Sequence, residues 1–371
     1  IDLVIVDLYP FEATVASGAS AEDIIEKIDI GGISLIRGAA KNFEDVVIIP
    51  SQADYATLEG ILRTRGAKTT LEERRHFARR AFAVSSHYDS AIFTYFDGED
   101  HSELRLSAQS AKPLRYGENP HQQGIFYGEL EKYFEQLHGK ELSYNNLQDV
   151  EAAVSLIQDF DEPTFAILKH NNACGCASRT TILEAWEAAL AGDPVSAFGG
   201  VLVANRPIDL RTAEEINKLF FEVLIAPDFT AEALPVLESK KNRILLRQLQ
   251  PVSAQWSYRS MLGGVLAQET DRAVETIQDM KPVTKVAPTA QELEDLVFAT
   301  KLVKHSKSNA IVLGKAGQLI ASGVGQTSRV DALKQAIEKA RHFGFELKGA
   351  VLASDAFFPF DDCVTLAAEA G

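Results

Sequence analysis

The sequence is poor in cysteine and in positive charge. Only three cysteines occur among 371 residues, and Cys174 and Cys176 are separated by a single residue. An odd count in a long chain argues against a disulfide framework and favours a reducing compartment, so we expect a cytoplasmic protein. Lysine and arginine total 37 against 52 aspartate and glutamate residues, a formal net charge of −15. This balance disfavours nucleic acid and anionic membranes as partners.

Long apolar runs are also missing. No stretch approaches the roughly 20 apolar residues of a transmembrane helix, and residues 1–7 lack the basic flank of a signal peptide. The chain begins without methionine on a strand-like run, and residues 366–371 have the pattern of an unfinished helix. We therefore expect a protein truncated at both ends. With 46% apolar and 24% charged residues, the composition is that of a folded globular protein with two or three domains.

Strand-length apolar runs alternate with amphipathic helical segments along the whole chain. This alternation predicts an α/β fold with largely parallel strands. Capping-box spacing predicts helix starts at Thr70, Thr181, Thr212 and Thr289, each with a glutamate three residues later. The expected strands are residues 3–8, 46–49, 91–94, 164–168, 200–204, 310–313, 319–322 and 350–353.

Two breaks in the pattern divide the chain. Residues 97–112 are polar and lack apolar periodicity, which is typical of a linker, and residues 281–284 have the pattern of an extended connector. We therefore expect three regions: a first α/β domain over residues 1–105, and two α/β lobes over residues 106–280 and 281–371.

The segment after the predicted strand 164–168 carries the strongest candidate chemistry. Lys169-His170-Asn171-Asn172 places a cation, a base and two amides at a strand end, where ligands bind in α/β folds. The neighbouring ammonium disfavours an imidazolium, so His170 is expected to be neutral and able to accept a proton. One alternative is a solvated lysine with a loop-capping histidine. Another is zinc bound by His170, Cys174 and Cys176, although no Cys-x-x-Cys pair supports it.

Further segments also contain ligand-binding chemistry. Residues 115–122 combine an arginine, an aromatic ring and amide donors, as a nucleotide or phosphate site would; a Gly/Pro-rich turn is the alternative. Lysines at 301, 304 and 307 suit a helix C-terminus without any ligand, whereas Asn309 begins a predicted strand. Gly323, Gly325 and Arg329 at a helix start favour an anion, although the pattern is neither a Walker loop nor a Rossmann fingerprint. Residues 354–362 expose three phenylalanines that could stack on a heteroaromatic ligand.

Taken together, these segments resemble one enzyme family. Eight strings, in family order along the whole chain, are similar to the bifunctional purine biosynthesis enzymes that join phosphoribosylaminoimidazolecarboxamide (AICAR) formyltransferase to IMP cyclohydrolase. The resemblance implies a partial methylglyoxal-synthase-like (Rossmann-like) domain followed by two cytidine-deaminase-like α/β lobes. It also implies a homodimer with shared transferase sites. The matching strings are residues 8–11, 28–32, 39–42, 115–122, 168–172, 196–200, 307–310 and 354–360.

The resemblance implies that the region after the linker transfers a formyl group from the cosubstrate 10-formyltetrahydrofolate to the 5-amino group of AICAR. His170 would accept the amine proton, Lys169 would stabilise charge at the formyl oxygen or the leaving nitrogen, and Asn309 would orient the carboxamide or formyl group. It implies no metal and no tightly bound cofactor. Asp362 is a folate-contact position, and the substrate-contact positions are Arg115, Tyr116, Asn146, Gly199, Glu222, Arg329 and Phe357.

The first domain resembles the cyclohydrolase, which closes the formylated ribotide to IMP with loss of water. Lys41 matches the proton donor/acceptor, with Tyr9 and Asp29 expected beside it. Asp7 stands where an asparagine is common in the family. One alternative is a ribotide-binding module or pseudoenzyme without turnover. Another is a deaminase-like hydrolase, which would need a zinc signature that this sequence lacks.

Overall fold

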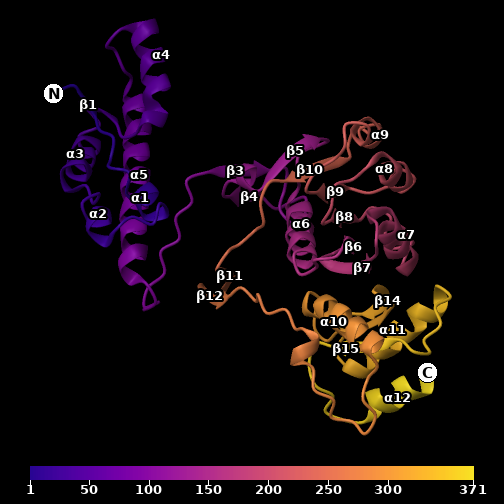
Figure 1. Ribbon diagram of the computed structural model, residues 1–371. Helices are drawn as coiled ribbons and strands as arrows, with labels where there is room; N and C mark the ends of the chain where they lie inside the picture. Colours follow the sequence, from indigo (N-terminus) through magenta and orange to yellow (C-terminus); the bar gives the residue numbers. More distant parts are fainter. The chain divides into compact units, whose positions relative to one another are not determined.

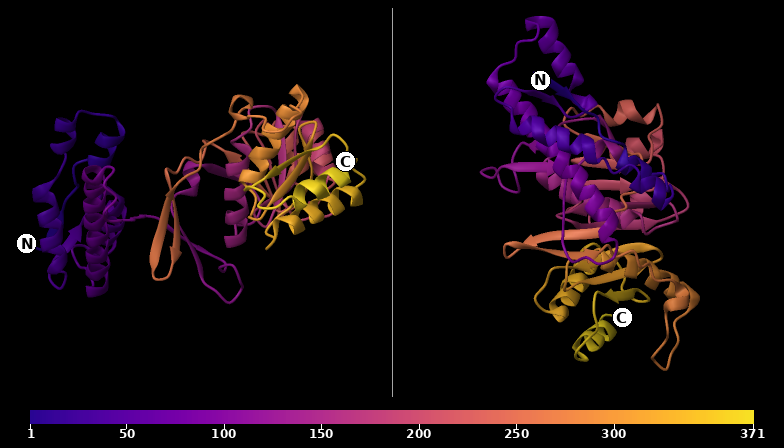
Figure 2. Two further views of the ribbon diagram at one scale, coloured as in Figure 1. Left: turned by 90° about the horizontal axis from the view of Figure 1, so that it is seen from below. Right: turned by 90° about the vertical axis from the view of Figure 1, so that its left-hand side faces the viewer.

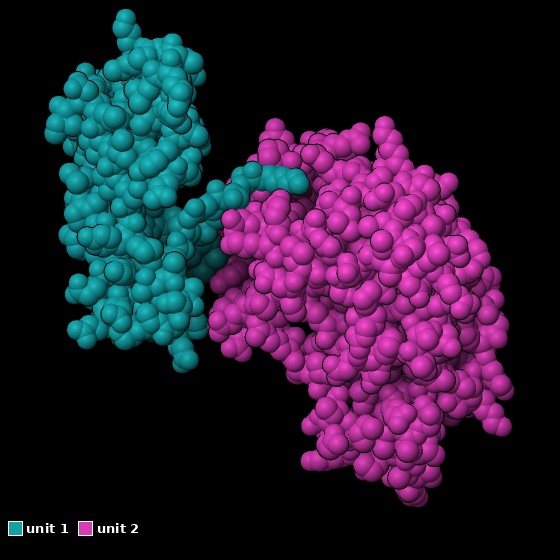
Figure 3. Space-filling view, turned by 45° about the horizontal axis from the view of Figure 1, so that its top comes forward, with its two compact units in different colours: residues 1–112 teal, residues 113–371 magenta.

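The computed structural model describes residues 1–371 and contains two compact units, residues 1–112 and 113–371 (Figure 3). The expected boundary at residue 105 lies in the segment without regular structure that follows helix α5. The expected division near residue 280 separates two parts of the second unit that share one sheet.

The first unit has a two-stranded parallel sheet and five helices. The two strands are joined by a crossover that contains three of the helices. Ile48 and Ile49 of the second strand pack against Ile36 and Phe77 to form the core. In chain order the elements are β1 (Leu3–Ile5), α1 (Phe11–Ala16), α2 (Ala21–Ile25), α3 (Ile30–Lys41), β2 (Val47–Ile49), α4 (Tyr55–Arg65) and α5 (Leu71–Asp97).

The expected strand at residues 91–94 is wrong, because these residues belong to α5. Tyr88, Ala91, Ile92 and Tyr95 recur at helical spacing and pack against Phe11. A four-residue apolar run of this kind fits a strand and one face of a helix equally well. The apolar residues that continue at helical spacing on both sides of the run favour the helix. The predicted capping box of Thr70 and Glu73 begins this helix.

The second unit is built on one nine-stranded sheet in the order β15-β13-β14-β7-β6-β8-β9-β10-β5. Two-stranded sheets β3-β4 and β11-β12 accompany it. Its strands are β3 (Ala111–Leu114), β4 (Gly124–Tyr127), β5 (Phe134–His138), β6 (Thr164–Lys169), β7 (Asn172–Ser178), β8 (Val201–Ala204), β9 (Val223–Ala226), β10 (Ile244–Gln248), β11 (Trp256–Met261), β12 (Gly264–Glu269), β13 (Ile311–Lys315), β14 (Gln318–Gly323) and β15 (Val351–Ser354). Its helices are α6 (Tyr144–Ile157), α7 (Ile182–Gly192), α8 (Leu210–Ile216), α9 (Ala233–Leu237), α10 (Ala290–Lys304), α11 (Arg329–His342) and α12 (Asp362–Ala370).

The prediction of largely parallel strands is wrong for this sheet. Only the pairs β8–β9 and β9–β10 are parallel. Two-residue turns join β6 to β7 and β13 to β14, and such short connections can only join antiparallel neighbours. The α/β class itself is confirmed, with a large central sheet and helices on both of its faces.

Two halves of the sheet repeat the same element order. The series α6-β6-β7-α7-β8-α8 recurs as α10-β13-β14-α11-β15-α12. In each half the first strand is central and pairs antiparallel with both of its neighbours. The two halves meet where β14 pairs with β7, at Gln318 and Ala177.

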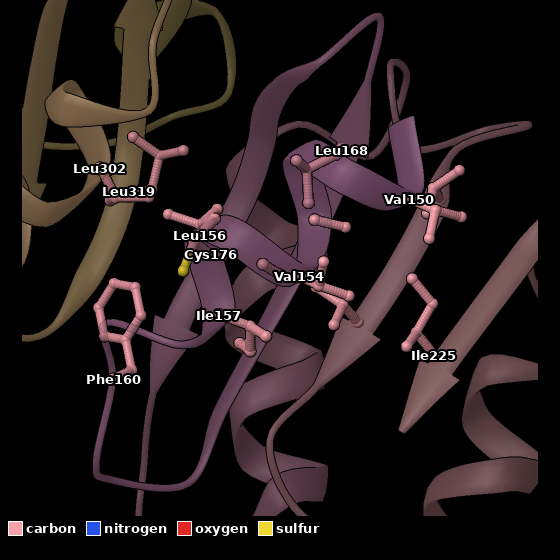
Figure 4. Packing of buried hydrophobic residues seen from close by; sticks show 14 of the residues in the cluster. Val150, Val154, Leu156, Ile157, Phe160, Leu168, Cys176, Ile225, Leu302 and Leu319 are labelled. Carbon is pink, nitrogen blue, oxygen red and sulfur yellow. The ribbon is translucent and has the colours of Figure 1, made fainter. Parts of the chain in front are cut away.

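The helices form a layer on each face of the sheet (Figures 1 and 2). One face packs against α6 and α10. The other face packs against α7, α8 and α9 in the first half and against α11 and α12 in the second. Val150, Val154 and Ile157 anchor α6 on the sheet, and Leu302 brings α10 into the same core (Figure 4).

The helix starts predicted at Thr181 and Thr289 are confirmed as capping boxes. The start predicted at Thr212 is wrong, because Asp209 caps α8 and accepts the Thr212 N–H at 2.8 Å. An aspartate is an equally good cap, and here it lies three residues earlier. No helix combines the length and the apolar character needed to cross a membrane.

Candidate functional site

Most of the predicted transferase residues lie at one end of the strands of the nine-stranded sheet. The strand register places the end of β6, the start of β7, the starts of β8 and β9, the start of β13 and the ends of β14 and β15 on the same side. Residues just beyond these strand ends therefore form one row, which we call the site end of the sheet. Lys169, Gly199, Glu222 and Asn309 belong to it.

His170 and Asn171 form the two-residue turn between β6 and β7. Both have left-handed backbone torsions, φ 53° and 65°, and Lys169 pairs with Asn172 at the strand ends. Positive φ at both central positions is the type I′ hairpin geometry. The His170 side chain is exposed, while the Lys169 ammonium donates a hydrogen bond to the Phe198 carbonyl at 2.7 Å. The turn thus presents the imidazole to solvent and ties the lysine to the loop before β8.

The cysteines of β7 are not arranged as metal ligands. A register shift between Ile167 and Leu168 makes a β-bulge, and Cys174 and Cys176 pack into the cores on opposite faces of the sheet. Burial raises the pKa of Cys174 to about 12 and also raises that of Cys176, which disfavours the thiolates that zinc needs. No group of three His, Cys, Asp or Glu side chains is placed to hold a metal ion. Because the two cysteines face opposite sides of the sheet, this geometry does not support the zinc alternative.

Asn309, in the second half of the sheet, is held by hydrogen bonds to Arg329 and Gln326. Its Oδ1 accepts a hydrogen bond from Arg329 Nη2 at 2.7 Å, and its Nδ2 donates to the Gln326 carbonyl at 3.0 Å. Arg329 also pairs with Asp355, which in turn accepts the Ala310 N–H. The Arg329 guanidinium is largely buried in this network and donates to Asn309, Asp355 and the Ser354 hydroxyl.

Gly199 and Glu222 occupy the adjacent strand starts. The Gly199 N–H donates to the Phe220 carbonyl at 2.8 Å, and its φ of 72° suits a residue without a Cβ. Glu222 forms an ion pair with Lys140 at 2.6 Å.

A basic pocket of about 690 Å³ opens beside Glu222. Lys240 and Lys241 make no ion pair, and buried Arg243 donates only to the neutral acceptors Asn217 Oδ1 and the Leu237 carbonyl, at 2.8 and 2.9 Å. Lys140 and Lys218 also line the pocket. These cations suit an anionic ligand. Sequence reasoning missed this pocket: Lys240, Lys241 and Arg243 form a short basic cluster that a solvated surface turn would explain equally well, and Lys140 and Lys218 lie far from it in the sequence.

Arg115 and Tyr116 lie at the end of β3, with the guanidinium 5.6 Å from the Tyr116 ring. The Gly117 N–H donates to the Gln122 carbonyl at 2.7 Å and closes the following turn. A Cβ on Gly124 would lie 2.5 Å from the Tyr116 carbonyl oxygen, so a glycine is needed there. Arg115 is exposed and forms no ion pair with a carboxylate.

The remaining predicted contacts differ in their surroundings. Asn146 is buried in the first turn of α6, where its Oδ1 accepts the Ser143 N–H of a capping box at 3.2 Å. Phe357, after β15, is 82% exposed. Asp362 begins α12 and accepts the Cys363 N–H at 2.7 Å. The structure thus gives Asn146 a structural role and leaves Phe357 available to a ligand.

In the first unit, no hydrogen bond, ion pair or ring contact joins the predicted residues Tyr9, Asp29 and Lys41 to one another. Asp29 caps α3 and accepts the Gly32 N–H at 2.6 Å, whereas Lys41 is the last residue of the same helix. At 1.5 Å per residue these two positions are about 18 Å apart. Tyr9 is exposed and lies 5.9 Å from the ammonium of Lys27. Sequence reasoning missed Lys27, which places an ammonium next to Tyr9 within the first unit.

These features define an α/β protein with an imidazole and a cation at the site end of a mixed sheet, next to a basic pocket. Residues 39–339 match the family described as AICARFT/IMPCHase bienzyme. The whole chain is 65% identical, over 371 residues, to the bifunctional purine biosynthesis protein PurH of Bacteroides thetaiotaomicron, and it spans 73% of that protein. Proteins of the same name from Acetivibrio thermocellus and Rhodospirillum rubrum are each 47% identical, over 388 and 390 residues, with the whole chain aligned to 74% of each. The chain therefore belongs to the AICARFT/IMPCHase bienzyme family, as its motifs predict.

Proposed function

We propose that the chain acts in purine biosynthesis, transferring a formyl group from 10-formyltetrahydrofolate to AICAR and, through its first unit, closing the formylated product to IMP. Family membership supports both activities. The structural observation that carries the transferase is the shared site end, where Lys169 and His170 stand between β6 and β7 and Asn309 precedes β13 of the same sheet. Mere ribotide binding, as in a pseudoenzyme, would not need this set of a base, a cation and an amide.

The transfer exchanges one C–N bond for another. The 5-amino nitrogen of AICAR attacks the formyl carbon, the bond from that carbon to N10 of the folate breaks, and tetrahydrofolate leaves with a proton on N10. An amine on a heteroaromatic ring is a weak nucleophile, so His170 takes its proton as the new bond forms. The Lys169 ammonium offsets charge at the formyl oxygen or at N10, and the Asn309 amide orients the acceptor.

The surroundings of the base suit the two anionic substrates. The basic pocket beside Glu222 supplies counter-charges for the ribotide phosphate, and Arg115 and Tyr116 provide a second cation and a ring for stacking. The exposed Phe357 is assigned to ligand stacking and Asp362 to the folate. We also propose that Asn146, Gly199, Glu222 and Arg329 form the ribotide pocket, directly or through their hydrogen-bond partners.

The first unit is assigned to ring closure. This reaction needs deprotonation of the carboxamide nitrogen and protonation of a departing hydroxyl. Lys41 is proposed as the proton donor/acceptor, with Tyr9 and Asp29 as partners. Because Asp29 and Lys41 are at opposite ends of α3, they act on different parts of the substrate.

The finer fold assignment rests on the repeated element order. We propose that residues 106–280 and 281–371 are two cytidine-deaminase-like lobes, supported by the series α6 to α8 and its copy α10 to α12. The first domain, residues 1–105, is proposed to be part of a methylglyoxal-synthase-like domain. A cytoplasmic location and a homodimer with shared transferase sites, both expected from the sequence, complete the proposal.

A coupled assay tests both activities. Release of tetrahydrofolate is monitored with AICAR and 10-formyltetrahydrofolate, and IMP formation is monitored from the formylated ribotide. The variant His170→Ala should lose formyl transfer and keep cyclisation, whereas Lys41→Ala should do the reverse. Unchanged formyl transfer in His170→Ala would refute the base, and loss of both activities in Lys41→Ala would refute two separate sites.

A further inference from the structure

The turn that carries His170 is not one that its own sequence favours. Type I′ turns prefer Asn-Gly or Gly-Gly because both central residues have positive φ. Here His170 and Asn171 occupy those positions, and a residue with a Cβ is less stable than glycine in the left-handed region. Contacts from outside the hairpin must therefore hold this turn in place.

Asp149 of α6 supplies such a contact. Its Oδ1 accepts the Asn171 backbone N–H at 2.7 Å. With the Asn171 amide oriented so that its nitrogen donates, this side chain also reaches Asp149 Oδ1 at 3.0 Å and the Gln148 carbonyl at 3.1 Å. The next residue along α6, Val150, is buried against the sheet (Figure 4). The carboxylate therefore belongs to a helix that is packed on the sheet, and its hydrogen bonds fix the position of the turn.

We call this contact, in which a helix aspartate accepts the N–H groups of a hairpin turn, a clamp. The second half of the sheet contains the same clamp, but its turn carries no histidine. Asp295 of α10 accepts the N–H groups of Ala316 and Gly317, at 2.9 and 2.8 Å, and these residues form the turn between β13 and β14. Both turn residues again have positive φ, 51° and 63°. Asn171 and Gly317 each follow their aspartate by 22 residues. The clamp is therefore a feature of the repeat, and only one copy holds a candidate base.

The charge of Asp149 also bears on His170. Burial raises the pKa of Asp149, while the Asn171 N–H and the electrostatic influence of His170 act in the opposite direction. The nearby Lys169 ammonium donates its hydrogen bond to the Phe198 carbonyl and not to Asp149. A carboxylate attracts a nearby positive charge, and His170 carries such a charge after it accepts a proton.

We propose that Asp149 is a positioning residue for formyl transfer: it fixes the left-handed turn that presents His170 and lends its negative charge to the imidazolium formed during the reaction. This inference rests on the proposed function, since it assumes that His170 is the base. Asp149 contacts Asn171 of the turn and is not among the proposed substrate contacts. Its effect should therefore fall on kcat rather than on the KM for AICAR.

The test compares substitutions at the two clamps in the formyl-transfer assay. Asp149→Ala should lower kcat about 100-fold, as expected for a displaced catalytic group, with the KM for AICAR changed less than about threefold. Asp149→Asn keeps an oxygen acceptor and loses the charge, so it should recover part of the activity, to within about tenfold of wild type. The matched controls Asp295→Ala and Asp295→Asn remove the same contact where no base is present, and should leave kcat within about twofold.

The inference is overturned if either Asp149→Asn or Asp149→Ala has the wild-type kcat, or if either raises only the KM for AICAR. It is also overturned if the Asp295 variants lower kcat as much as the Asp149 variants, since the effect would then be general loosening of the sheet. Should Asp149→Ala fail to fold, Asp149→Asn decides alone. Wild-type activity in His170→Ala would refute the proposed base, whereas an inactive His170→Ala beside a fully active Asp149→Asn refutes only the role of Asp149.

Discussion

At the scale of single residues, several side chains of the candidate site are already fixed by the protein. Lys169 is held by the Phe198 carbonyl, and Asn309 is held by Arg329 and by the Gln326 carbonyl. Groups held in advance need little rearrangement as charge develops, which is how polar sites lower a barrier. The exposed Arg115 and Phe357 are free to meet a ligand.

Arg329 is expected to act through Asn309. Asn309→Ala should lower kcat for formyl transfer about 100-fold, as for the loss of one oriented polar group, and Arg329→Ala about tenfold because the Asn309 amide loses its Oδ1 partner. The double variant should be no slower than Asn309→Ala alone, since the two residues work as one unit. Steady-state kinetics of the four proteins measure this coupling.

Additive effects on kcat would contradict this arrangement and show that Arg329 acts independently of Asn309. Lys334→Ala offers a control on α11, the helix that begins with Arg329, because its side chain is exposed and belongs to none of the proposed contacts.

The site residues predictable from the sequence were those in compact strings. Lys169, His170 and Asn309 stand next to apolar strands, and their neighbourhood at the sheet end follows from strand order. Asp149 was not predictable, because it lies in an ordinary helical context and gains its meaning only from Asn171, 22 residues along the chain. Asn146 matched a family position, yet within α6 its side chain caps the helix.

At the scale of elements, predictions succeeded where a local rule was decisive. Capping boxes correctly marked the starts of α5, α7 and α10. Strand direction failed, since the sequence pattern of a buried strand is the same in parallel and antiparallel pairs. The expected strand at residues 91–94 failed because its apolar residues also fit the face of α5.

Asp29 is both the N-cap of α3 and a candidate catalytic group. Asp29→Ala should lower the free energy of unfolding of the first unit by about 1 kcal/mol, the usual cost of losing an N-cap. Asp29→Asn keeps a capping side chain, so it should retain stability but lose at least about tenfold in IMP formation. Thermal unfolding and the cyclisation assay, run on both variants, separate the two roles.

Full cyclisation by Asp29→Asn would mean that the carboxylate serves only the helix. Ser20→Ala is a suitable comparison, because Ser20 caps α2 in the same unit by accepting the Asp23 N–H and has no assigned chemical role.

At the scale of the whole second unit, ion pairs join the two halves of the repeat on both faces of the sheet. Asp159, just after α6, contacts Lys304 at 3.0 Å and His305 at 2.8 Å at the end of α10. Asp193, at the end of α7, contacts Lys339 of α11 at 2.5 Å. Burial by itself would raise the pKa of Asp159, but hydrogen bonds with His305 and Lys304 outweigh it and hold this pKa below its ordinary 3.8. Burial is likewise outweighed at Asp193 by Lys339 and Ser196.

Because these pKa values are lowered, the stability that the ion pairs between the two halves contribute depends on pH. A carboxyl with a lower pKa in the folded state stabilises the fold above its unfolded pKa, and this contribution is lost as the pH falls through the folded value. The stabilisation by Asp159 and Asp193 is therefore complete above about pH 4 and is lost progressively as the pH falls below that value.

Asp159→Asn should lower the free energy of unfolding at pH 7 by about 2–3 kcal/mol, because Lys304 and His305 lose a charged acceptor in a largely buried place. Below about pH 4 the gap between this variant and wild type should narrow, since wild-type Asp159 then takes up a proton as well. Urea unfolding at a series of pH values measures both quantities, with Asp161→Asn as the control for an exposed aspartate two residues away. A gap that stays constant from pH 7 to the acid limit would show that the Asp159 charge does not hold the two halves together.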